Sequence, residues 1–184
     1  MDLDWGALLV AQLEFYWDVH LRPRLDGLTD EEYFWEPVGG CWSVRRAPDG
    51  RMVMESGQDG PFTTIAWRMM HVAVGVFGAR ASTFFGDGSV PADADMSDPR
   101  HEPATLPDNA ADAVALLDHN YHWWRDGIAG LGHDGLTAPL GPRGGFFAEE
   151  PMAALIVHLN RETMHHGGEI GVLRDLYRDR YHPG

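Results

Sequence analysis

The chain of 184 residues contains no lysine and a single cysteine, and its acidic residues greatly outnumber its basic ones. Fourteen arginines stand against 28 aspartates and glutamates, which gives a formal net charge of -14 at pH 7. Such a chain repels phosphate backbones and anionic membrane surfaces, so we expect neither nucleic acid nor membrane as a partner. One cysteine, Cys41, rules out an internal disulfide framework. We expect it to be a small buried side chain in a protein of the reducing cytoplasm.

Long hydrophobic runs are missing as well. No apolar stretch approaches the roughly 20 residues that are needed to span a bilayer. The first residues show no basic region followed by an apolar core, so no signal peptide is expected. Hydrophobic residues make up 44% and charged residues 23%, an ordinary globular composition. The length predicts one well-cored domain over residues 1–184.

Four long segments carry apolar residues at three- and four-residue spacing, the pattern of helices packed on one face. They cover residues 4–25, 63–85, 108–131 and 149–181. The stretches between them are rich in Gly, Pro and Asp. The fold class predicted from this pattern is all-α, a four-helix bundle, whose interior is a common place for a metal site.

Two of the connections have patterns of their own. Within residues 39–62, between the first and second helices, two short extended runs flank the turn signal Pro48-Asp49-Gly50. This pattern predicts a small β-hairpin insertion. Residues 89–105 are acidic and contain proline, which predicts an irregular surface loop.

The last helix contains His158, Glu162 and His166 at four-residue spacing. Residues four apart share one helix face, so two of them can converge on one divalent metal. Either His158 and Glu162 or Glu162 and His166 could bind one ion. All three could not, because residues on three consecutive turns are spread too far along the helix axis to reach the same ion. A solvated polar face is the alternative. Apolar residues border the same stripe, and an inward-facing Glu is rare unless it is paired or binds a metal.

A third ligand must come from another helix, and His71 is the best candidate. It lies in the middle of the second helix among apolar residues. Taken alone, such a residue is more often a hydrogen-bonded core histidine than a ligand. His119 and His122 compete for the role, although their segment is more polar. The remaining histidines near termini or in loops are expected to be exposed: His20, His101, His133 and His182.

Four residues next to His166 in the last helix can each be explained either by packing or by a role at a metal site. Gly167-Gly168 costs helix stability, about 1 kcal/mol for each glycine relative to Ala, which predicts close packing of a facing helix or clearance beside a metal. Glu169 and His165 could orient a ligand imidazole, or could lie on the surface.

Three segments together resemble the DinB-like superfamily of YfiT-type metal-dependent enzymes. They are residues 35–43 (WEPVGGCWS), 64–72 (TIAWRMMHV) and 162–170 (ETMHHGGEI). The resemblance implies an up-down-down-up bundle with three metal ligands: one His on the second helix and two residues four apart on the last. Carried over by motif, these ligands are His71, Glu162 and His166, and His158 lies outside the set.

The first of the paired positions is commonly His in that family, and here it is Glu162. A His/Glu/His set resembles the branch that contains mycothiol-dependent thiol S-transferases. It implies a divalent cofactor, zinc or nickel, and a low-molecular-weight thiol of the mycothiol or bacillithiol type, whose metal-bound thiolate attacks a small electrophile. The alternatives are a hydrolase with a metal-activated water, and a non-catalytic bundle with a structural metal or a bound small ligand.

Two further expectations concern substrate and partner. Arg68 or Arg80 could bind an anionic substrate. The resemblance also makes a homodimer possible, with Trp123 or Trp124 as exposed aromatic residues at the contact.

Overall fold

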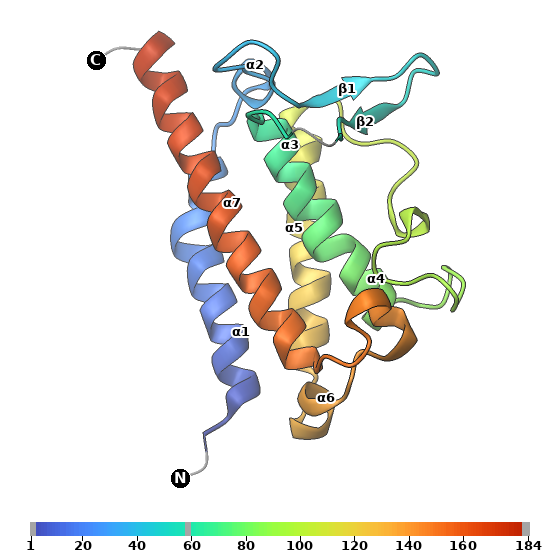
Figure 1. Cartoon of the computed structure of the whole chain (residues 1–184). Helices are drawn as coiled ribbons and strands as arrows, with labels where there is room; N and C mark the ends of the chain where they lie inside the picture. The colour runs from blue at the N-terminus through green and yellow to red at the C-terminus, as the bar shows by residue number, and fades with distance from the viewer. Residues whose placement is uncertain (1–2, 58–59, 182–184) are drawn as a thin grey trace.

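Four helical rods form the bundle in the computed structural model, which describes residues 3–57 and 60–181. In chain order the rods are α1 (Trp5–Tyr16) with η1 (Trp17–Leu21) and η2 (Arg22–Leu25); α3 (Ile65–Met70) with η3 (His71–Gly78) and α4 (Ala79–Phe85); α5 (Ala110–Ala129); and α7 (Met152–Tyr181). Figure 1 shows the first and last rods running up and the middle two running down. The predicted up-down-down-up bundle is confirmed. None of the described helices combines the length and apolarity that crossing a membrane requires.

Side-chain caps explain where the rods begin. The side chains of Asp4, Thr64 and Asn109 accept hydrogen bonds from backbone N–H groups in the first turns of α1, α3 and α5. Capping satisfies donors that have no partner inside a helix, so these short polar residues set the helix starts within one to two residues of the predicted ones.

The hairpin insertion is confirmed. Strands β1 (Val44–Arg46) and β2 (Met52–Met54) pair antiparallel with Arg45 opposite Val53. Gly50 in the connecting turn has a φ of +88°, which glycine adopts without a steric penalty. The shorter helices of the connections are α2 (Asp30–Tyr33), η4 (Pro99–His101), α6 (His133–Thr137) and η5 (Gly141–Phe147).

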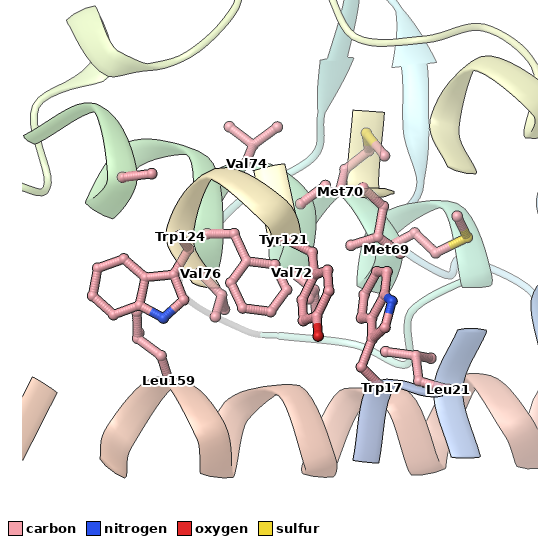
Figure 2. Close-up of a cluster of buried hydrophobic side chains, with 14 of the residues drawn as sticks. Trp17, Leu21, Met69, Met70, Val72, Val74, Val76, Tyr121, Trp124 and Leu159 are labelled. Atoms are coloured by element: carbon pink, nitrogen blue, oxygen red, sulfur yellow. The ribbon is translucent and has the colours of Figure 1, made fainter. Parts of the chain in front are cut away.

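Aromatic side chains hold the rods together (Figure 2). Trp17 of the first rod stacks on Tyr121 of α5 with ring centroids 3.8 Å apart, and Phe77 meets both rings edge-on. Trp124 is fully buried in this core, so the expectation that it is exposed for a dimer contact was wrong. Trp124 lies on the same buried face of α5 as Leu117 and Tyr121. The neighbouring Trp123 is half-buried. Cys41 is buried, as expected.

The loop between α4 and α5 is less superficial than expected. Ala94 and Met96 within it are buried against the bundle. His101, which we expected to be exposed, lies with its Nδ1 2.9 Å from the Ser82 hydroxyl. Its Nε2 is 3.2 Å from the Thr83 hydroxyl, so two side chains of α4 anchor the loop. His182 lies outside the described residues.

The two adjacent glycines of α7 have different surroundings. A Cβ on Gly167 would lie 2.5 Å from the Tyr16 hydroxyl of α1, whereas a Cβ on Gly168 would meet nothing within 4 Å. Close packing between α1 and α7 therefore explains Gly167 and not Gly168. We expect Gly168→Ala to stabilise the protein by about 0.5–1 kcal/mol, because alanine has the higher helix propensity. Gly167→Ala should destabilise it by about 1–3 kcal/mol through overpacking. Urea unfolding of the two variants checks this, and equal effects would contradict it.

Candidate metal centre

Three donor atoms from two rods converge on one point in the bundle. They belong to His71, at the junction of α3 and η3, and to Glu162 and His166 of α7. All three lie within 4.8 Å of one another. The Oε2 atom of Glu162 is 3.6 Å from Nε2 of His166 and 3.9 Å from Nε2 of His71. Tetrahedral zinc with ligands at about 2.0–2.1 Å places its donors roughly 3.4 Å apart. The spacing of these atoms fits a divalent cation.

A hydrogen-bond network with Glu169 and Arg68 sets the orientation of the His166 ring. Its Nδ1 lies 2.8 Å from Oε2 of Glu169, and the same oxygen accepts a 2.8 Å hydrogen bond from Nε of Arg68. Burial opposes ionisation of Glu169, but hydrogen bonds and charge from Arg68 and His166 hold its pKa below the ordinary value. An ionised carboxylate only accepts hydrogen bonds, so Nδ1 of His166 carries a proton; when the ring is neutral, its lone pair is therefore on Nε2, the nitrogen nearer Glu162.

Arg68 is therefore a structural partner of the site rather than a substrate-binding group. Its side chain is buried, and it also donates to the backbone carbonyl of Thr63. Of the two interpretations of Glu169, orienting a ligand imidazole is the one that this geometry supports. His165, in contrast, is exposed, with its Nε2 3.6 Å from Oε1 of Glu169.

His71 is held by an aromatic neighbour. The Trp67 ring stacks on it with centroids 5.3 Å apart and planes at 9°. Trp67 in turn donates its indole N–H to the backbone carbonyl of Glu55, directly after the hairpin. The hairpin thus supports the tryptophan that covers one face of His71. Nothing in the residue spacing indicated this contact, because it depends on how the insertion folds back onto α3.

The helix departs from α geometry at His71, which is the first residue of the π-helical segment η3. Asn120 of α5 donates a 2.8 Å hydrogen bond to the carbonyl of Ala73 inside this segment. A Cβ on Gly78 would lie 2.7 Å from the same amide nitrogen, so glycine makes room for it. Wide turns of this kind are frequent at functional sites. Periodicity predicted a regular helix here and missed both Asn120 and the wide turn.

The other candidate histidines do not join the three donors. His119 and His122 are exposed on α5, and neither belongs to any group of potential ligands among the described residues. His158 lies one turn before Glu162, with Nδ1 3.8 Å from Oε1 of Glu162. Its Nδ1 also lies 2.7 Å from a guanidinium nitrogen of Arg161. The structure thus brings together the Glu162/His166 pair with His71 and leaves His158 at the edge.

A second group of potential ligands shares His166. It consists of His165, His166 and Glu169. Here Glu169 is already engaged by Arg68 and His166, so using it as a ligand would disturb an existing ion pair. The group around His71 requires no such disruption, and it is the better candidate.

His71 is suited to act as a neutral ligand at pH 7. Burial, and next the charge of nearby His166, lower its pKa to about 4. The metal-free protein should therefore lose stability as the pH falls from about 6.5 to 4, because the unfolded chain binds the proton first. Proton NMR titration of the metal-free protein should show the His71 ring titrating below pH 5. An ordinary pKa near 6.5 for His71 would contradict the prediction.

A helical bundle with histidine and glutamate donors on facing helices is an architecture of metal-binding proteins. The family model described as the DinB superfamily matches residues 12–170 and thus includes His71, Glu162 and His166. The chain belongs to the DinB superfamily. No curated protein and no solved structure matches the chain significantly.

Proposed function

We propose that the protein is a metal-dependent thiol S-transferase with a low-molecular-weight thiol as co-substrate. The observation that carries this proposal is the convergence of His71 Nε2, Glu162 Oε2 and His166 Nε2 within 4.8 Å. Zinc or nickel suits two nitrogens and one carboxylate oxygen. His71, Glu162 and His166 would hold a divalent cation with an open coordination position, and the cation would lower the pKa of a thiol at that position and so favour the reactive thiolate.

The residues around the site prepare it for this role. His71 is neutral at pH 7 and offers a lone pair without first losing a proton. Glu162 contributes a negative charge that balances part of the cation's charge. Glu169 fixes the His166 ring and is itself held by Arg68, so the site is preorganised before any ligand binds. The stacked ring of Trp67 shields one face of His71 from water.

Monochlorobimane tests the proposal directly. Zinc- or nickel-loaded protein is mixed with the probe and, in turn, with mycothiol, bacillithiol or cysteine. In the expected reaction, the thiol sulfur forms a bond to the chloromethyl carbon, chloride leaves with the bonding electrons, and the thiol proton passes to the buffer. The fluorescence of the conjugate should increase faster than in the same mixture without protein. Glu162→Ala should abolish the increase, and His165→Ala, which removes an exposed histidine on the same helix, should preserve it.

The result also separates the alternatives. A rate equal to the uncatalysed reaction with every thiol would reject the transferase. Hydrolysis of a chromogenic ester that Glu162→Ala abolishes would then identify a hydrolase. If neither reaction occurs although metal is bound, the bundle is a non-catalytic metal-binding protein.

A further inference from the structure

A cavity of about 380 Å³ is lined by residues of α4, η5 and the first part of α7, up to Arg161, the residue before Glu162. Its size is that of a pocket for a small molecule. Most of its wall is apolar, with Met96, Leu140 and Leu155 among the lining residues. The polar side chains that line it are Arg80, His158, Arg161 and Glu150.

Two of these side chains connect the cavity to the candidate metal centre. His158 lines the cavity, and its Nδ1 is 3.8 Å from Oε1 of Glu162. Arg80 donates a hydrogen bond to the carbonyl of Gly75, the residue that lies against the His71 ring. His158 therefore lies between the cavity and Glu162, one helical turn before that residue.

The arginines of the cavity stand out in a strongly acidic chain. Among the residues that the structure describes, ten of the fourteen arginines form ion pairs with Asp or Glu. Arg80 and Arg161 belong to the four that do not, and both line this one cavity. Within the described part of the chain, the buried Nε of Arg80 has no hydrogen-bond partner at all. The protein thus leaves this guanidinium incompletely paired, and its N–H groups that face the cavity can bind an acceptor on a ligand.

The remaining charges limit what that ligand can be. Glu150 lines the cavity, and Asp95 lies close enough for its charge to act on Arg80. These two carboxylates make the surroundings unsuitable for a multiply charged anion such as phosphate. A single carboxylate can accept hydrogen bonds from both guanidinium groups. The apolar wall then matches an apolar body.

We propose that this cavity is the subsite for a small monocarboxylate with an apolar body, whose carboxylate is bound by Arg80 and Arg161. Its role as the electrophile's subsite rests on the proposed function, whereas carboxylate binding itself does not. In that role the anchored carboxylate would hold the apolar body beside His158, toward the donor atoms.

Fluorine NMR titrations of the metal-free protein test the inference with three probes of one shape: 4-(trifluoromethyl)benzoate, its amide and 4-(trifluoromethyl)benzylamine. We expect the carboxylate to bind at least about tenfold more tightly than the amide or the amine, because charge-assisted hydrogen bonds stabilise only the carboxylate. Arg80→Gln and Arg161→Gln should each weaken carboxylate binding about tenfold and leave amide binding unchanged. The control variant Arg180→Gln removes an equal charge from α7 about five helical turns beyond Arg161, and it should leave carboxylate binding unchanged.

Several results would overturn the inference. One is that the carboxylate probe binds no more tightly than the amide probe. Another is that the amine probe binds as tightly as the carboxylate probe. A third is that Arg161→Gln binds the carboxylate probe as tightly as the unmodified protein does. The Arg161 side chain is exposed, so its replacement should not disturb the fold. Carboxylate binding that appears only after zinc is added, and that ignores both arginine variants, would place the carboxylate on the metal instead. Because the titrations use metal-free protein, a failed transferase assay leaves their outcome unaffected.

Discussion

Replacement of His71 by alanine should lower the affinity of the protein for zinc by more than about 100-fold, as should Glu162→Ala and His166→Ala. Loss of a group that only orients a ligand already costs about 10–100-fold. Loss of one of three donor atoms should cost more, because two protein ligands hold the ion far less well. Competition against a chromophoric zinc chelator measures the affinity, and elemental analysis of the purified variants gives the stoichiometry.

The matched control distinguishes the two groups of potential ligands. His165→Ala removes a histidine next to His166 on the same helix, but one that belongs only to the second group. We expect its zinc affinity to stay within about threefold of the unmodified protein. If zinc binding survives His71→Ala and is lost in His165→Ala, the metal is bound by the second group and our assignment is wrong.

Replacement of Arg174 by methionine should lower the free energy of unfolding by about 3–5 kcal/mol. Arg174 of α7 forms a two-pronged ion pair with Glu32 of α2, at 2.8 and 3.0 Å. It also donates to the carbonyls of Arg24 and Asp26. Both members of the pair are buried, with 8% of Arg174 and 3% of Glu32 exposed. Without the arginine, the carboxylate and the carbonyls stay buried with fewer partners, which is costly.

The exposed neighbour one turn further along the helix is the control. Arg178 pairs with Asp175 at the surface, where 60% and 51% of the two side chains are accessible. Arg178→Met should change stability by less than about 1 kcal/mol, because water screens such pairs. Urea unfolding of metal-free protein avoids stabilisation by bound metal. A loss below about 1 kcal/mol in Arg174→Met would show that the buried pair contributes little. The double variant with Glu32→Met should recover part of the loss, since it leaves no unpaired charge.

Much of the fold could be predicted because its signals are local. The apolar spacing of the four long segments gave helix ranges close to the observed ones. The turn signal around Pro48-Asp49-Gly50 likewise identified the hairpin. What could not be predicted depends on neighbours far away in the chain. Trp124 looked like a surface residue in a polar segment, yet it is fully buried in the core.

The candidate site, like the fold, was predictable only where its residues are close together in the sequence. The sequence alone determined that Glu162 and His166 share a face of the last helix, because helical geometry relates residues four apart whatever surrounds them. Only the tertiary structure decided that His71, and not His119 or His122, lies opposite them, since this depends on the rotation and packing of separate helices. The same packing pairs Arg68 with Glu169 and leaves Arg80 facing a cavity. Spacing along the chain carries no record of such contacts, because they join residues through space.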